Sequence, residues 1–166
     1  MREYGQSFTV KPTPINGCDV YFAKLIPDHR GFFSEIFSSQ RYPFPVRQIN
    51  CSHSHANVFR GIHTGIAFNK VVTCVKGSII DYCVDLREDS NTYKTIVSQR
   101  LTEENFHQLI IPAGCGHGFF AEEDSVVVYG QCATYQPNGE TTHCYKDLGI
   151  QLPVVNVILS EKDSCE

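Results

Sequence analysis

Short apolar segments separated by turn residues run through most of this chain, and helical periodicity is nearly absent. Strands are predicted over residues 71–75, 79–86, 106–111 and 125–133, with short strands over 8–26 and another within 46–58. The Lys76-Gly77 turn predicts a hairpin between the first two. Single helical turns are predicted only over 34–41, after Thr102 and after Ser160. This pattern is typical of an all-β fold. Long apolar strands together with one set of inward-facing polar side chains favour a jelly roll around a central pocket.

Composition limits the remaining possibilities. The chain has 166 residues with no internal repeat and no linker, so a single domain over residues 1–166 is predicted. The formal net charge is −4 and no basic cluster is present, which argues against a nucleic-acid partner. No apolar segment approaches the roughly 18 residues that a membrane span requires. An anionic ligand must therefore be bound by individually placed arginines and lysines.

Eight cysteines raise the question of disulfides. None forms a Cys-x-x-Cys pair, and several lie inside apolar segments, where a reduced cysteine packs as a small hydrophobic residue. Residues 1–6 contain no apolar signal-peptide region. The sequence therefore predicts a reduced, cytoplasmic chain with neither a disulfide framework nor a cysteine zinc site.

The segment from Arg60 to Lys70 concentrates groups that bind charge or transfer protons. Arg60 offers a planar set of donors for a phosphate, and His63 can take or give a proton near neutral pH. In a strand over residues 57–63, these two side chains face opposite sides. They can therefore serve one ligand only if the strand bends between them, and Gly61 permits such a bend.

Two other groups of residues each have a structural and a functional interpretation. Gln48 and Asn50 begin a run of polar side chains at two-residue spacing, which suits a solvated strand face or the wall of a polar pocket. Arg30, Phe32 and Glu35 lie where a turn enters an aromatic strand. They suit ordinary strand packing or a slot for a planar base.

Histidines raise the possibility of a metal site. His53 and His55 lie on one face of a strand, and His63 and His117 would complete a set of imidazole ligands suited to zinc, iron or copper. No glutamate follows the His-x-His pair at the spacing common in metal-binding barrels of this class. The pair also precedes a turn, where solvent is an equally good partner.

The alternative is proton transfer without a metal. His63 would act as a general base, and Asp163 would fix its tautomer. Lys70 would stabilise a developing oxyanion, and Tyr129 would supply a proton because a phenol with a pKa near ~10 is protonated at neutral pH. The residue pattern alone leaves both alternatives open.

These residues also form an ordered series of motifs. The series runs Asp28-x-Arg30-Gly31-Phe32-Phe33-x-Glu35, Gln48-x-Asn50-x-Ser52, Arg60-Gly61-Ile62-His63, Lys70, Asp85-Leu86-Arg87, Ile111-Pro112-Ala113-Gly114-x-x-His117-Gly118-Phe119, Tyr129, Tyr135-x-Pro137 and Leu159-Ser160-Glu161-Lys162-Asp163. Over about residues 20–163, the chain closely resembles the dTDP-4-dehydrorhamnose 3,5-epimerase family. The resemblance implies a cupin-type double-stranded β-helix, usually a homodimer, that epimerises a nucleotide-linked 4-keto-6-deoxy sugar without metal or cofactor.

The resemblance also implies roles for individual residues. His63 is the base paired with Asp163, Lys70 lies beside the C4 oxygen, and Tyr129 returns a proton from the opposite face of the sugar. The implied binding residues are Arg60 for the diphosphate; Gln48, Asn50, His117 and Tyr135 in the pocket; and Arg30, Phe32 and Glu35 for the nucleotide across the dimer interface.

Departures from the family pattern concern the substrate. The family usually has Leu-His-Tyr-Gln at the histidine and a longer loop before the lysine, whereas here Thr64 and Gly65 follow His63. Gly130 replaces a usual lysine, and Leu152 replaces a usual tryptophan. The short loop is similar to that of members that epimerise GDP-linked 4-keto-heptoses in capsule synthesis. The nucleotide, the sugar and the choice of C3, C5 or both therefore stay open.

Three other functions compete with epimerisation. A 3,4-ketoisomerase on the same scaffold moves the carbonyl, but such enzymes usually lack the tyrosine found here as Tyr129. A metal-dependent cupin would use the histidines as ligands. A sugar-nucleotide-binding module without catalysis would not need the set of His63, Lys70, Tyr129 and Asp163.

Overall fold

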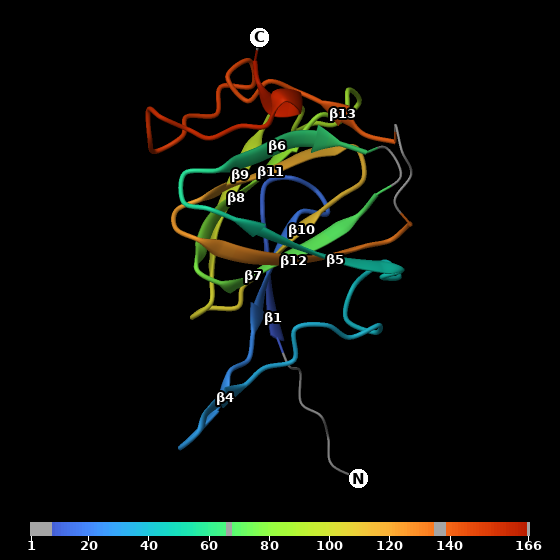
Figure 1. The fold of residues 1–166 in the computed structure, drawn as a ribbon. Coiled ribbons are helices and arrows are strands. Elements are labelled where there is room, and N and C mark those ends of the chain that lie inside the picture. The colour runs from blue at the N-terminus through green and yellow to red at the C-terminus, as the bar shows by residue number, and fades with distance from the viewer. Residues whose placement is uncertain (1–7, 66–67, 135–138, 166) are drawn as a thin grey trace.

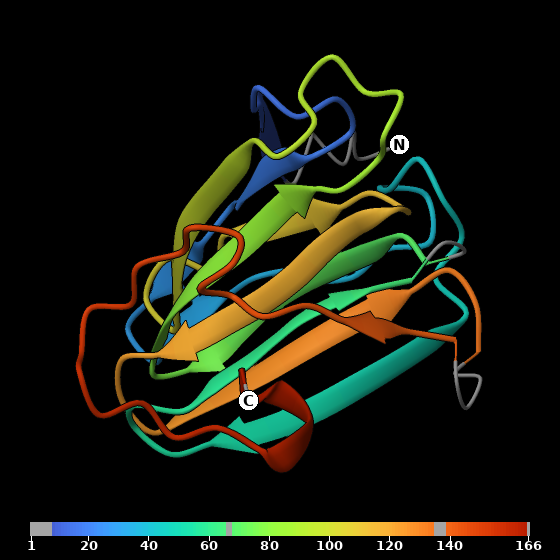
Figure 2. The ribbon, with the colours of Figure 1, turned by 90° about the horizontal axis from the view of Figure 1, so that it is seen from above.

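Two antiparallel β-sheets pack against each other in the computed structural model, which describes residues 8–65, 68–134 and 139–165 (Figures 1 and 2). The six-stranded sheet has the order β1 (Phe8–Pro12), β2 (Asp19–Ala23), β10 (Gln108–Ile111), β7 (Lys70–Lys76), β12 (Ser125–Gln131) and β5 (Gln48–Ser54). The five-stranded sheet has the order β13 (Thr141–Thr142), β6 (Phe59–Thr64), β11 (Cys115–Ala121), β8 (Ser78–Asp85) and β9 (Ile96–Thr102). This arrangement confirms the predicted all-β jelly roll.

The core lies between the sheets because each strand turns one apolar face inward. Val72 and Val127 come from the six-stranded sheet, and Leu101 and Phe119 come from the five-stranded one. Buried cysteines fill space among them as small hydrophobic residues, as the sequence predicts. Among the described residues, no helix is both long and apolar enough to cross a membrane.

One predicted pairing is wrong. The strands β7 and β8 exist and are joined at Gly77, but they do not form a hairpin: β7 pairs with β10 and β12, and β8 pairs with β9 and β11. Gly77 has a φ of +75°, and an added Cβ would approach the carbonyl oxygen of Asp124 to 2.5 Å. The glycine therefore lets the chain cross from one sheet to the other, a connection that resembles a hairpin turn in sequence.

The predicted helical turns have different outcomes. A 3-10 turn, η1 (Glu161–Asp163), follows Ser160 as expected. The Thr102 hydroxyl accepts hydrogen bonds from the N–H groups of Glu104 and Asn105, so it caps a turn. Residues 34–41 form no helix; the segment is irregular, with one turn in which the Arg41 N–H donates to the Ser38 carbonyl.

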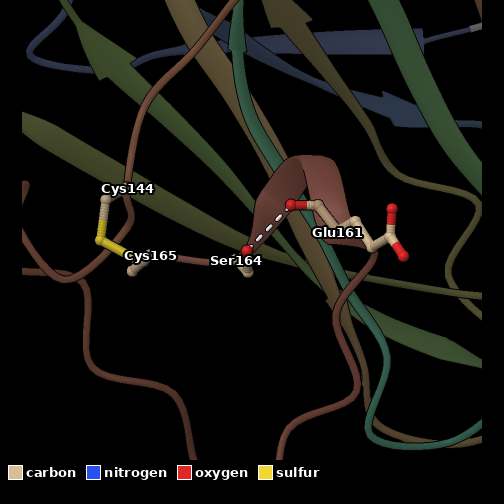
Figure 3. The surroundings of a disulfide bond; sticks show 4 residues. All are labelled: Cys144, Glu161, Ser164 and Cys165. Carbon is tan, nitrogen blue, oxygen red and sulfur yellow. Dashed lines mark hydrogen bonds between the residues drawn. A yellow bond between two sulfur atoms is a disulfide. The ribbon is translucent and has the colours of Figure 1, made fainter.

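The prediction of a chain without disulfides is also wrong. Cys144 and Cys165 form a disulfide (Figure 3). The two residues are 21 positions apart and have no local motif, so only the path of the C-terminal segment brings them together. That segment returns to the five-stranded sheet, where the Phe59 N–H donates to the Ile158 carbonyl and the Ile158 N–H to the Asn57 carbonyl.

A small hairpin stands apart from the two large sheets. Its strands are β3 (Ile26–Asp28) and β4 (Gly31–Phe33), and it projects away from the rest of the fold (Figure 1). Phe32 and Phe33 on this hairpin are 49% and 66% exposed. Large apolar side chains on a projecting element are unusual in a monomer.

A buried carboxylate anchors the loop after β8. The side chain of Asp85 is fully buried and accepts hydrogen bonds from Arg87 Nε and Nη2, both at 2.8 Å, from Ser90 Oγ at 2.5 Å and from Thr92 Oγ1 at 2.6 Å. The Arg87 hydrogen bonds hold the pKa of Asp85 well below its usual value, and those from Ser90 and Thr92 add to the effect, although burial opposes it.

We expect Asp85→Asn to lower the free energy of unfolding by about 3 kcal/mol at pH 7, because it removes the charge of a buried carboxylate that accepts hydrogen bonds from the partly buried Arg87. Because the pKa of Asp85 is lower in the folded state than in the unfolded state, its ionisation stabilises the fold at pH values above the unfolded pKa of about 4. This contribution to the free energy of unfolding is lost as the pH falls through the folded-state pKa. The difference between wild type and variant, measured by urea unfolding, should therefore shrink below about pH 4. Asp89→Asn, an exposed change in the same loop, is the control. A pH-independent difference would contradict this account.

Candidate active site

A cavity of about 340 Å³ receives side chains from both sheets and from the C-terminal segment. It is lined by Ser52, Arg60, His63, Lys70, His117, Phe119, Tyr129, Glu140, Ser160, Lys162 and Asp163. All four predicted catalytic residues are therefore brought to one cavity, together with two of the predicted binding residues, Arg60 and His117.

Gly61 provides the bend that the sequence requires. Along β6 and β11, Arg60 pairs with Phe119 and His63 with His117, so the register shifts between these pairs. Gly61 has a φ of +116°, and an added Cβ would lie 2.6 Å from the carbonyl oxygen of His117. Because only glycine fits this position, the irregular strand can direct both Arg60 and His63 into the cavity.

His63 and Asp163 form a hydrogen-bonded pair, with Nε2 and Oδ1 2.6 Å apart. Burial favours the protonated form of Asp163, but the hydrogen bond and charge of His63 and the hydroxyl of Ser160 outweigh it and lower the pKa of Asp163. Since the carboxylate can only accept, Nε2 carries the proton and donates it to Asp163. The Nδ1 lone pair of the neutral ring is then the one that can accept a proton.

Lys70 is directed into the cavity from β7 and forms an ion pair with Glu140, with Nζ and Oε1 2.9 Å apart. Burial raises the pKa of Glu140, but the charge and hydrogen bond of Lys70 lower it overall. Glu140 was not identified from the sequence, because it lies in a polar segment without strand periodicity. The pair fixes an ammonium group in the cavity wall.

A second histidine–carboxylate pair lies beside the first. His117 Nε2 is 2.7 Å from Asp81 Oδ1, and Asp81 is fully buried. Burial raises the pKa of Asp81, and the charges of His117 and Lys70 only partly offset the effect. Asp81 was also missed, although a carboxylate in the middle of the apolar strand β8 was a signal that could have identified it.

The cavity's proton-transfer candidates come from different sheets. His63 lies on β6 of the five-stranded sheet, whereas Tyr129 lies on β12 of the six-stranded sheet. Arg60 also lines the cavity, and its Nε donates to Ser54 Oγ at 2.9 Å and its Nη2 to the His53 carbonyl at 3.0 Å. A ligand in the cavity can therefore meet an imidazole from one sheet and a phenol from the other.

Several predicted binding residues lie away from this cavity. Arg30 and Phe32 line a separate hollow in the β3–β4 hairpin, and Glu35 forms an ion pair with Arg41. On β5, Gln48 Nε2 donates to Asn50 Oδ1 at 2.7 Å. Neither side chain lines the cavity, although Asn50 lies opposite Tyr129 in the pairing of β5 with β12. Tyr135 lies outside the described residues.

The structure does not assemble the four histidines considered as metal ligands. His53 and His55 lie at the surface with Asp124, and their ligand atoms are within 4.8 Å of one another. His63 and His117 are each bound to a carboxylate, and among the described residues no group of potential ligands includes either of them.

Comparison with known proteins places the chain in a family. The family model described as dTDP-4-dehydrorhamnose 3,5-epimerase matches residues 12–166. The chain belongs to this family. Membership makes it a carbohydrate epimerase of the isomerase class, as the series of motifs predicted.

Individual relatives are similar over most of their length. The dTDP-4-dehydrorhamnose 3,5-epimerase of Mycolicibacterium smegmatis is 36% identical over 151 residues, which cover 84% of this chain and 75% of the relative. The crystal structure of the enzyme of that name from Sulfolobus tokodaii has a TM-score of 0.88 and 37% identity, covering 95% of this chain and 93% of that one. The dTDP-6-deoxy-D-glucose-3,5-epimerase of Legionella pneumophila, solved with dTDP-4-keto-L-rhamnose, has a TM-score of 0.88 and 32% identity and covers 94% and 89%.

Proposed function

We propose that this chain inverts C3, C5 or both in a nucleoside-diphosphate-linked 4-keto-6-deoxy sugar, with a dTDP-linked hexose as the first substrate to test. The observation that supports this most strongly is the convergence of His63, Lys70 and Tyr129 on one cavity, with the base and the acid on opposite sheets. Relatives that carry the family name act on, or were solved with, dTDP-linked sugars of this class.

The reaction starts with removal of a proton from a carbon next to the C4 ketone. His63 Nδ1 takes the proton, and the C–H electron pair moves into the bond toward C4 while the carbonyl pair moves onto oxygen, which gives an enolate. Asp163 stabilises the imidazolium that forms. Lys70 lies where the negative charge develops, and its ammonium stabilises the enolate more than the ketone.

Inversion requires that the proton returns from the other face. Tyr129 donates its phenolic proton to the same carbon while the enolate collapses to the ketone. The phenolate then recovers a proton from solvent, and the His63 imidazolium releases its proton to solvent, so both groups return to their starting states. A base that returned its own proton would restore the starting configuration. The origin of His63 and Tyr129 in different sheets therefore matches the stereochemical requirement.

Lys70→Met should lower kcat by about 10²–10³-fold, the usual effect of removing one preorganised donor to an oxyanion. Its effect on KM should be small, because the interaction strengthens only as the enolate forms. Steady-state kinetics on the 4-keto sugar nucleotide measure both constants. Lys76→Gln, an exposed change at the other end of β7, is the control. A large rise in KM with kcat unchanged would show instead that Lys70 binds the ground state.

The nucleotide is proposed to lie between two subunits of a homodimer. By resemblance, Arg60 would bind the diphosphate, and Gln48, Asn50, His117 and Tyr135 would be further pocket residues. Arg30, Phe32 and Glu35 lie away from their own cavity, and the hairpin that carries the first two projects outward with exposed aromatic rings. A second copy placed against this hairpin would cover the rings and bring those side chains to the partner's cavity. Mass measurement by light scattering tests the dimer.

The nucleotide base and the sugar size are finer proposals. Thr64 and Gly65, which follow the base on a short loop, would leave room for a larger sugar, such as a GDP-linked heptose of the kind used in capsule or lipopolysaccharide synthesis. A thermal-shift series with dTDP, GDP, UDP and CDP identifies the base, because the tightest ligand raises the melting temperature most. A cytoplasmic location, where nucleotide sugars are made, fits this role.

The central test uses heavy water. The protein is incubated with dTDP-4-keto-6-deoxyglucose in D₂O, and the sugar is followed by NMR. We expect deuterium at C3, C5 or both, with inversion at the labelled carbons and the ketone still at C4. A ketone moved to C3 would identify a 3,4-ketoisomerase. Loss of activity to a chelator, with metal present in stoichiometric amount, would identify a metal-dependent cupin. Binding without exchange would identify a non-catalytic module.

A further inference from the structure

We propose that the Cys144–Cys165 disulfide positions the His63–Asp163 pair, and that its reduction lowers catalysis while the fold persists. The proposal rests on the function proposed above, in which this pair removes the proton. It concerns two residues that do not line the cavity, so they are positioning residues.

One side of the disulfide holds Asp163. Cys165 follows this residue by two positions and is separated from the 3-10 turn η1 only by Ser164. The Ser164 N–H donates to the Ser160 carbonyl at 3.0 Å. Figure 3 shows the second bond, in which Ser164 Oγ donates to the Glu161 carbonyl at 2.8 Å. These bonds hold Ser164 against the turn, and Cys165 is the covalent neighbour of Ser164, so a restraint on Cys165 is transmitted to Asp163.

The other side holds the strand of His63. Cys144 follows His143, whose N–H donates to the Ile62 carbonyl at 2.8 Å and whose carbonyl accepts from the Ile62 N–H at 3.3 Å. Ile62 is the neighbour of His63 in β6, and β13 pairs Thr142 directly with His63. The disulfide therefore connects the segment that is hydrogen-bonded to the base with the segment that carries its carboxylate.

The connections form a closed ring. It runs from His63 through Ile62, across the backbone hydrogen bonds to His143 and Cys144, through the disulfide to Cys165, and back along η1 to Asp163, which is hydrogen-bonded to His63. The backbone hydrogen bonds of Ile158 with Asn57 and Phe59 tie the same segment to the five-stranded sheet, but they lie before η1. The disulfide links the chain covalently on the C-terminal side of η1.

Reduction opens this ring without removing any group from the cavity. A dithiol reductant transfers two electrons to the disulfide, so that two cysteine thiols form and the reductant becomes a cyclic disulfide. Both cysteines are partly exposed, so a small reductant can reach them. The Asp163 turn then loses its covalent link to the segment of Cys144. It keeps the hydrogen bonds of Ser160 and Ser164 and those that Asp163 accepts from His63 and the Gly61 backbone N–H, so the separation of Asp163 from His63 becomes less well defined.

The test compares wild type, Cys144→Ser and Cys165→Ser, with Cys51→Ser as the matched control because Cys51 is exposed and distant in sequence from both segments. A misplacement of about 1 Å in catalytic geometry typically costs up to 10²-fold. We expect kcat to fall about tenfold in both serine variants and in dithiol-treated wild type, with KM within about twofold. Reoxidation should restore the wild type, and the reductant should not affect the serine variants.

An independent readout separates this proposal from the proposed function. The His63 Nε2 proton, held by Asp163, should give a slowly exchanging imidazole resonance in the oxidised protein without substrate, and reduction should broaden or remove it. If the resonance responds but no sugar is epimerised, the proposed function fails and the positioning role stands. If reduction, verified by mass spectrometry, leaves both resonance and kcat unchanged, the positioning role is wrong. Loss of the folded circular dichroism signal on reduction would also contradict it, because the disulfide would then support the whole fold.

Discussion

Replacing His63 with asparagine should lower kcat/KM for epimerisation by roughly 10²–10⁴-fold, the range for loss of one general base. The asparagine amide has no lone pair on nitrogen that can take a proton from carbon, although it can still contact Asp163. Deuterium incorporation from heavy water into the sugar should fall by the same factor, because exchange and inversion share the step of proton removal.

His55→Asn is the matched control, since its ring is exposed and lies outside the cavity lining. Both proteins should melt within a few degrees of wild type and should bind dTDP equally well. If the His63 variant still exchanged protons at the wild-type rate, another group would be the base. Asp163 and Tyr129 would then be the next residues to examine.

Tyr129→Phe should separate two events that are coupled in the wild type. The variant keeps the ring and its packing but lacks the phenolic proton, so re-protonation from the second face should slow by about 10²–10⁴-fold. His63 remains, and it can remove a proton and return a solvent-derived one to the same face. We therefore expect deuterium in the recovered substrate with its original configuration, and little inverted product.

Deuterium exchange without inversion is the result expected specifically when Tyr129 is the general acid that has been removed. Tyr93→Phe, which changes a half-exposed phenol outside the cavity lining, is the control. Equal loss of exchange and inversion in the Tyr129 variant would show that the phenol takes part in proton removal or binding. Unchanged inversion would show that the second proton comes from another donor.

Local features were predictable from the sequence when they depend on residues near one another along the chain. The bend at Gly61 follows from the spacing of Arg60 and His63, and the turn at Ser160 follows from its capping side chain. The apolar strands follow from composition over a few residues. The family motifs then favoured the catalytic roles of Lys70 and Tyr129 over the alternatives, a choice that the residue pattern alone left open.

Long-range features were not predictable from local patterns. Gly77 favours a turn, but whether the two strands beside it pair or separate depends on β10–β12, which lie further along the chain. The partner of Lys70 is 70 residues away at Glu140, and the disulfide depends on how the C-terminal segment crosses β6. Such contacts arise from the whole jelly roll, so they appear only when both sheets are in place.

The central claim is that a sugar ring lies between His63 and Tyr129 with its C4 oxygen beside Lys70. A crystal structure with a bound dTDP-linked 6-deoxy sugar that lacks the ketone tests it most directly, because this ligand cannot react. We predict His63 Nδ1 within about 3–3.5 Å of C3 or C5 on one face, the Tyr129 hydroxyl on the opposite face, and Lys70 Nζ beside the C4 substituent. A ring with both side chains on the same face, or with Lys70 bound only to the diphosphate, would contradict the account.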